Sequence, residues 1–179
     1  MPVRYAVFVL TLVLMAGCQE QTAPGPSSPT PEVWTDGHAA AWDIMASARL
    51  LTLITLDEAG QPQARILEAL PPDSGRFDVW MGTNARSAKV REIRANPRAT
   101  VFYQIPDGTG YVTLRGRASI VDDHALKDRY WQPHWTAFYP DPERMYVLIH
   151  FVPEDGEVVS FAHGLEGDSL TWAAPEIDF

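Results

Sequence analysis

A short run of polar residues in the middle of the chain has the composition of an anion site. Thr83, Asn84 and Ser87 follow a stretch with strand character, and Lys89 opens a segment with helical spacing. Hydroxyls, backbone N–H groups and one ammonium at the start of a helix favour a bound anion, above all a phosphate. By residue type alone, an ordinary strand-to-helix turn explains the run better, with Thr83 or Ser87 as N-cap and Lys89 in solvent.

The motifs of the common enzyme classes are missing from the sequence. It contains no G-x-S-x-G and no G-x-x-x-x-G-K-[ST], and Gly108-Thr109-Gly110 lacks the third glycine of a dinucleotide-binding loop. The five histidines are scattered without a paired spacing, so no metal site is expected. Hydrolase and nucleoside triphosphatase functions lose support, and no side chain is assigned a catalytic step.

The single cysteine, Cys18, ends an N-terminal segment with the pattern of a targeting signal. One positive charge precedes an apolar run from Tyr5 to Met15, and two small residues stand before the cysteine, which is the layout of a secretory signal. Residues 14–18 resemble a bacterial lipobox, so the sequence predicts a signal peptide over residues 1–17 and a lipid-modified Cys18. The alternative is a buried structural cysteine in an uncleaved apolar helix.

Residues 19–31 are rich in Pro, Ser, Thr and Gln and have no apolar periodicity. This composition is typical of a solvated linker, so residues 18–33 are expected to form the lipidated cysteine and a flexible tether. Gln19 is not the Asp that retains many lipoproteins at the inner membrane. The expected location is therefore the bacterial cell envelope, anchored by lipid to the outer membrane and facing the periplasm.

The charge of the chain argues against a nucleic-acid partner. Lys and Arg number 14 against 23 Asp and Glu, which gives a net charge of −9. A chain without a basic excess cannot neutralise a phosphate backbone. A nucleic-acid partner is therefore not expected.

The alternation of apolar residues predicts one mainly β, α+β domain over residues 34–179. Six or seven short strands with helices as inserts favour a closed or split β-barrel over a βαβ sheet. Asp36 is the expected N-cap of the first helix, and a turn at residues 153–156 is expected to separate the last two strands. The expected helices cover 36–49, 86–95 and 125–130, and the expected strands cover 50–56, 63–70, 77–81, 99–105, 111–121, 146–152 and 157–161.

The stretch from Val79 to Tyr103 resembles the pyridoxamine 5'-phosphate oxidase-like, FMN-binding split-barrel family, in its general stress protein branch. Residues 83–89 match the family run T-N-x-x-S-x-K, and residues 96–99 match N-P-R-[VA]. Further matches are Gly60-Gln61-Pro62, Arg65, residues 111–118 and residues 128–131. In order and spacing they extend from about Trp42 to Phe161.

The resemblance implies a six- or seven-stranded split barrel, a homodimer and a flavoprotein function. It assigns FMN binding to Arg65, Thr83, Ser87 and Lys89, which match residues that hold the FMN phosphate and ribityl chain; F420 and haem are the alternative cofactors. Ala88 replaces an arginine of the family run, and Arg86 would substitute only if it faced inward. A flavin-contacting glutamine falls at about Tyr111, and the C-terminal R-x-H pair has no counterpart near His163.

Three classes of function stay open on this sequence. A flavin-dependent oxidoreductase of unknown substrate, distinct from a genuine pyridoxamine phosphate oxidase, is favoured. A non-catalytic binding module for flavin, F420 or haem and a structural lipoprotein are the alternatives. The aromatic segment Tyr130 to Tyr139 could cover a flavin ring or admit a planar substrate. Alternatively, Tyr130 and Trp131 could be core on a short helix while Trp135 to Tyr139 pack a dimer interface.

Overall fold

The computed structural model describes residues 35–179, which belong to a compact unit that begins at Trp34. The expected signal peptide, the lipid-modified Cys18 and the tether lie outside the described residues. The helices of the described part are α1 (Asp36–Ser47), α2 (Ala88–Ala95), α3 (His124–Tyr130) and α4 (Pro142–Met145), with short 3-10 helices η1 (Pro133–Ala137) and η2 (Phe161–His163). The strands are β1 (Leu50–Leu56), β2 (Pro62–Glu68), β3 (Val79–Asn84), β4 (Arg98–Gln104), β5 (Gly110–Val121), β6 (Tyr146–Ser160) and β7 (Glu176–Asp178).

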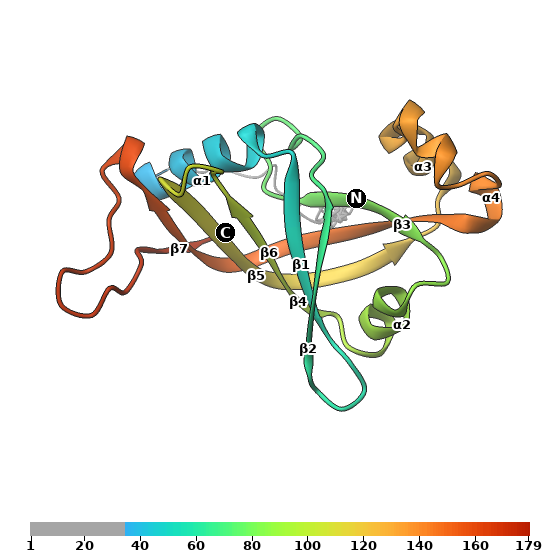
Figure 1. Cartoon of the computed structure of the whole chain (residues 1–179), viewed down its shortest axis with the longest axis horizontal. Helices are drawn as coiled ribbons and strands as arrows, with labels where there is room; N and C mark the ends of the chain where they lie inside the picture. Colours follow the sequence, from blue (N-terminus) through green and yellow to red (C-terminus); the bar gives the residue numbers. More distant parts are fainter. Residues whose placement is uncertain (1–34) are drawn as a thin grey trace, which may run out of the picture. The chain divides into compact units, whose positions relative to one another are not determined.

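The strands form one antiparallel sheet in the order β2-β1-β4-β5-β6-β3, and β7 pairs with β6. Figure 1 shows this sheet curled strongly, with α2 near one end of the curl and α3 and α4 beyond the end of β3. A curled antiparallel sheet with a few helices is a split barrel. The expected mainly β fold is therefore confirmed.

The expected turn at residues 153–156 is wrong, because β6 runs without a break from Tyr146 to Ser160. Pro153 lacks a backbone N–H, and a strand tolerates that only at an irregularity. The register between β5 and β6 shifts at Arg115 and Gly116, opposite this proline. A Cβ on Gly116 would lie 2.2 Å from the Val152 carbonyl oxygen, so the bare glycine lets the two backbones approach.

The N-cap of the first helix lies one residue earlier than expected, and the helix ends at Ser47 rather than at residue 49. Thr35, and not Asp36, is the N-cap of α1: its hydroxyl accepts a hydrogen bond from the His38 backbone N–H, and the His38 side chain reaches back to the Thr35 backbone. The buried face of α1 packs on the main core of the barrel. That core is formed by alternating side chains of the strands, among them Leu53, Met81 and Phe151.

A second core covers the opposite face of β3 and β6. Alternate residues of β3 divide between the two cores: Met81 packs in the first, whereas Trp80 packs against the second. A Cβ on Gly82 would lie 2.5 Å from the Trp135 ring and 2.9 Å from the Tyr146 ring, so the missing side chain lets both rings lie on the strand. Asp123 caps α3, accepting a hydrogen bond from the Leu126 N–H.

Candidate functional site

Four elements meet at one polar corner of the barrel, which we define by Thr55 of β1, Arg65 of β2, Thr83 of β3, and Ser87, Lys89 and Glu92 in and before α2. The helix α2 packs on the barrel through Val90 and Ile93, which are buried, and its other side chains are charged residues and alanines. All four residues expected to bind a cofactor belong to this polar corner. Thr55 and Glu92 were not expected there.

Arg65 is held by a network of short hydrogen bonds. Its Nη1 donates to the Thr55 hydroxyl at 2.6 Å and to the Gln63 carbonyl at 3.0 Å, and its Nη2 donates to the Glu92 carboxylate at 2.8 Å. The Thr55 hydroxyl in turn donates to the other Glu92 oxygen at 2.6 Å. The guanidinium is therefore fixed in place and largely neutralised by a carboxylate on α2.

Lys89 has a different environment. Its ammonium donates to the buried Thr83 hydroxyl at 3.1 Å, and no ion pair of Lys89 with an acidic side chain occurs among residues 35–179. Burial lowers the pKa of the Lys89 ammonium below its ordinary value, and the charge of Arg65 lowers it further, while Glu92 opposes the shift. A half-buried, uncompensated cation of this kind favours an added anion.

Ser87 is the N-cap of α2, but its side chain makes no capping hydrogen bond. Its hydroxyl oxygen is buried and has no hydrogen-bond partner within the described residues. A buried polar group without a partner costs free energy, on the order of 1–3 kcal/mol. A phosphate oxygen at this helix end would satisfy the hydroxyl, so the residues present fit the phosphate end of FMN.

The position of the missing family arginine is not filled by a neighbour. Ala88 is exposed at the start of α2, and Arg86 is also exposed, with its backbone N–H bonded to the Asn84 side chain at 2.9 Å. The condition that Arg86 face inward is not met. A cavity of about 380 Å³ beside Ala88 is lined mainly by charged residues, namely Asp57, Glu58, Arg91 and Glu92.

The aromatic segment contributes to the second core rather than to the polar corner. Tyr130 stacks on Trp80 with ring centroids 4.7 Å apart, and its hydroxyl donates to Asp73 at 2.7 Å. Burial and this acidic neighbour raise the pKa of Tyr130 to about 12. Tyr130 is therefore core, as expected, and the buried Trp135, which donates its indole N–H to Glu68 at 2.6 Å, belongs to the same core of the chain.

Two residues of the polar corner, Glu92 and Thr55, were missing from the expected site. Glu92 lies three positions after Lys89 on the same helix, a spacing that places both side chains toward one face. Thr55 occupies an inward position in the apolar strand Leu50–Leu56 and is fully buried. A polar residue in the apolar series of a strand is the signal that could have pointed to a buried polar network.

Neither a membrane span nor a metal cluster was found in the part of the chain that the structure describes. No helix there is long and apolar enough to cross a bilayer. Over the same residues, no three His, Cys, Asp or Glu side chains are grouped so that they could hold a metal ion.

Solved structures support the same fold. General stress protein 26 from Bacillus anthracis superimposes with a TM-score of 0.63 at 21% identity, covering 79% of this chain and 97% of that one. A heme binding protein from Mycobacterium smegmatis superimposes with a TM-score of 0.58 at 21% identity, covering 71% of this chain and 55% of that one.

Sequence comparison places the chain in a family. The pyridoxine/pyridoxamine 5'-phosphate oxidase of Pseudomonas paraeruginosa is 30% identical over 116 residues, which are 65% of this chain and 53% of the relative. The chain thus spans about half the length of the curated relatives that it matches. The model of the pyridoxamine 5'-phosphate oxidase family matches residues 38–160, most of the described part. The chain belongs to the pyridoxamine 5'-phosphate oxidase family.

Proposed function

We propose that the chain binds FMN through its phosphate at the polar corner and acts as a flavin-dependent oxidoreductase. One observation carries this proposal. The buried Ser87 hydroxyl has no partner, and it lies two residues before a half-buried Lys89 that no carboxylate neutralises directly. An anion with several acceptor oxygens would satisfy both groups at once. Membership in the family supports a flavin as the source of that anion.

Each residue of the polar corner has a separate task in this proposal. Lys89, oriented by Thr83, would supply the charge, and Ser87 with the first N–H groups of α2 would supply hydrogen bonds. Arg65 would contribute through its electric field, because Glu92 and Thr55 already use its donors. A bound flavin supplies the electron or hydride transfer, so no side chain of the corner needs a chemical role.

The arrangement favours a weaker phosphate site than the family run would give. Glu92 places a carboxylate next to Arg65, and Ala88 provides no guanidinium where the family run has arginine. A bidentate arginine contact is among the strongest contacts to phosphate, and this corner offers none. We therefore expect FMN to bind more weakly than it would with an arginine at position 88, with Lys89 as the main determinant of affinity.

Oxidation of pyridoxamine phosphate itself is not part of the proposal. The C-terminal R-x-H pair is missing from this chain, and the nearest histidine, His163, is bound to Asp43 of α1 at 3.0 Å. The proposed substrate is another small molecule.

Haem is the second candidate ligand. The similarity to a heme binding protein from Mycobacterium smegmatis favours it, although at 21% identity this similarity concerns the fold alone. Haem binding would make the protein a binding module rather than an oxidoreductase. The two ligands have different absorbance spectra, so one titration separates the two functions.

We further propose a homodimer that is lipid-anchored at Cys18 and faces the periplasm. The expected signal peptide supports the anchor, and the family resemblance supports the dimer. Phe138, 68% exposed beside the second core, is an apolar residue that a second copy would cover. Sedimentation should give a dimer at micromolar concentration; a monomer at every concentration would remove this part of the proposal.

The test of cofactor binding is a spectroscopic titration of the purified full chain. FMN, riboflavin and haem are added separately, and bound ligand is measured by absorbance and by quenching of flavin fluorescence. The proposal expects FMN to bind clearly more tightly than riboflavin, because only FMN has the phosphate. Equal affinity for the two flavins would exclude the polar corner as a phosphate site, and haem binding alone would favour the second candidate.

A further inference from the structure

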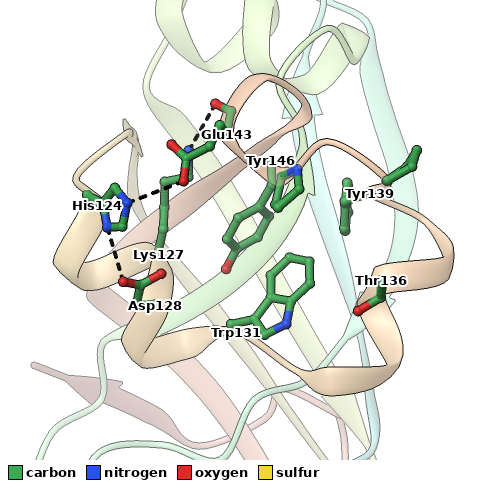
Figure 2. Close-up of a pocket in the computed structure, with 10 residues that line it drawn as sticks. His124, Lys127, Asp128, Trp131, Thr136, Tyr139, Glu143 and Tyr146 are labelled. Atoms are coloured by element: carbon green, nitrogen blue, oxygen red, sulfur yellow. Dashed lines mark hydrogen bonds and ion pairs between the residues drawn. The ribbon is translucent and has the colours of Figure 1, made fainter.

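A separate pocket lies on the other face of β3 from the polar corner. Thr83, which holds Lys89, and Asn84 are consecutive strand residues, so their side chains point to opposite faces. Tyr146 pairs with Asn84 across the β3–β6 ladder and lines the pocket. The pocket, which we call the aromatic pocket, has a volume of about 260 Å³ and is formed by α3, η1, α4 and the start of β6 (Figure 2).

Three aromatic rings form the inner wall of the aromatic pocket. Trp131 and Tyr146 meet edge to face with centroids 5.3 Å apart, and Tyr139 lies 5.4 Å from Tyr146 and 6.2 Å from Trp131. Pro140 and Pro142 complete the apolar lining. The half-buried Trp131 and Tyr139 rings offer apolar surface to a planar ligand and can attract a cation, whereas the buried Tyr146 ring already has the Lys127 ammonium 5.9 Å from its centroid.

The Tyr146 hydroxyl is a polar atom that the protein leaves unsatisfied. Tyr146 is only 1% exposed, and its hydroxyl has no hydrogen-bond partner within the described residues. Figure 2 shows this hydroxyl directed toward the space between Trp131 and the helix α3. Burial and the nearby Tyr139 raise the pKa of Tyr146, so the group stays a neutral phenol that can accept or donate one hydrogen bond.

The rim of the pocket is acidic. The carboxylates of Asp128 and Glu143 lie on either side of the exposed His124 imidazole, at 3.0 Å and 3.3 Å from its two nitrogens. The buried Lys127 does not reverse this charge, because its ammonium already binds Asp122 at 2.9 Å and the Glu143 carbonyl at 3.3 Å. A cation entering the pocket is therefore favoured, and an anion meets two carboxylates.

We propose that the aromatic pocket binds a small aromatic amine in its protonated form and does not require a bound flavin to do so. The rings would hold the apolar body, the acidic rim would attract the ammonium, and an N–H of the ligand would donate to the Tyr146 hydroxyl. The size agrees with this class: a cavity of about 150 Å³ holds benzene, and drug-sized ligands use roughly 300–1,000 Å³. A volume of about 260 Å³ has room for one ring system with a short side chain.

The test compares three probes of one shape and different charge on the full chain at pH 7. Phenethylammonium, 2-phenylethanol and 3-phenylpropanoate are titrated separately and followed by calorimetry and by ligand-observed NMR. We expect phenethylammonium to bind about tenfold more tightly than the neutral alcohol, and the carboxylate not to bind. Equal affinity for all three, or preference for the carboxylate, overturns the proposal.

Variants assign the binding to this pocket. Glu143→Gln and Asp128→Asn should each weaken phenethylammonium several-fold and leave 2-phenylethanol unchanged, whereas Glu58→Gln, on the exposed β1–β2 turn, serves as the matched control and should change neither. Unchanged amine binding in both rim variants contradicts the proposal.

Tyr146→Phe is the variant that a purely structural role cannot imitate. Because the hydroxyl is unsatisfied in the free protein, its removal should leave the melting temperature unchanged or raise it. The same change should weaken phenethylammonium about tenfold, the effect of one lost hydrogen bond to a charged group. If Tyr146→Phe lowers stability and keeps amine binding, the hydroxyl has a structural role and the proposal fails. Lys89→Ala should leave amine binding intact, which keeps this result separate from the flavin proposal.

Discussion

The Arg65 guanidinium and the Glu92 carboxylate form an ion pair at 2.8 Å, and the two side chains are only 23% and 10% exposed. The pair joins an edge strand of the sheet to the helix that carries Lys89. It stabilises the polar corner, and it also occupies the donors that Arg65 would otherwise offer to an anion. The ion pair therefore increases the stability of the corner and lowers its affinity for phosphate.

Replacing Glu92 should raise the affinity for FMN and lower the stability of the protein. In Glu92→Gln the amide oxygen still accepts from Thr55, while the negative charge beside Arg65 is lost. We expect FMN to bind about threefold to tenfold more tightly, riboflavin to be unchanged, and unfolding free energy to drop by about 1–3 kcal/mol. Flavin fluorescence titration and urea denaturation measure the two effects. Lower stability with no gain in FMN affinity would make the pair purely structural.

Removing the ammonium of Lys89 should weaken FMN selectively. A charge-assisted contact to phosphate contributes roughly 1.5–3 kcal/mol, so Lys89→Ala should weaken FMN about tenfold to a hundredfold and barely affect riboflavin. Arg94→Ala, an exposed cation on the same helix, is the matched control and should change neither flavin. Equal losses for both flavins would place Lys89 in folding rather than in recognition.

The pH dependence of FMN binding follows from the same residue. The pKa of the Lys89 ammonium is lowered below 10.5, so FMN affinity should fall as pH rises through that lowered value, while riboflavin affinity should not follow. The stability of the free protein depends on pH in the opposite sense. Between the lowered pKa and 10.5 the unfolded chain binds the Lys89 proton more strongly than the folded chain does, so the free energy of unfolding increases as pH rises. Lys89→Arg, which stays charged, should abolish the fall in FMN affinity.

Two glycines give a prediction about packing. A Cβ at residue 116 would meet the backbone of Val152 and Pro153, whereas a Cβ at residue 82 would meet the rings of Trp135 and Tyr146. Rings can shift more easily than a paired backbone. Urea denaturation should therefore show a larger loss for Gly116→Ala than for Gly82→Ala, which we expect to cost about 1–3 kcal/mol. The reverse order would mean that the aromatic rings of the second core shift less easily than the paired backbone beside Gly116.

The lipid anchor is tested by one substitution outside the described residues. Cys18→Ser removes the acceptor of the expected lipid, so the protein should leave the membrane fraction and lose labelling by palmitate. Fractionation of cells that express each form measures this. A wild type that takes up no palmitate, with a substituted protein that stays in the membrane fraction, contradicts the anchor.

Local pattern was sufficient for most of the fold. The apolar run Leu50–Leu56 beside the turn at residues 57–62 predicted β1 with its observed bounds. The single long β6 could not be predicted in this way. Pro153 and Gly156 read locally as a turn, and only the pairing with Gly116 across the sheet lets the strand continue.

The sequence indicated residues that the fold brings to one corner, and their cofactor role stays a prediction, but it did not indicate the charge balance among them. The run from Thr83 to Lys89 is continuous in sequence, so the pattern itself could indicate an anion site. The pairing of Arg65 with Glu92 joins residues 27 positions apart on separate elements. Such a contact depends on how α2 docks on the sheet, which neither spacing nor composition specifies.

Successive side chains of β3 point to opposite faces of the sheet, so this one strand contributes to both proposed sites. Thr83 orients Lys89 on one face, and Gly82 supports Tyr146 on the other. A ligand on either face that shifts this strand would change the affinity of the other face. Linkage requires the effect to be mutual and equal in size: whatever factor an amine imposes on FMN binding, FMN must impose on amine binding. A titration of each ligand in the presence of the other would give that factor twice.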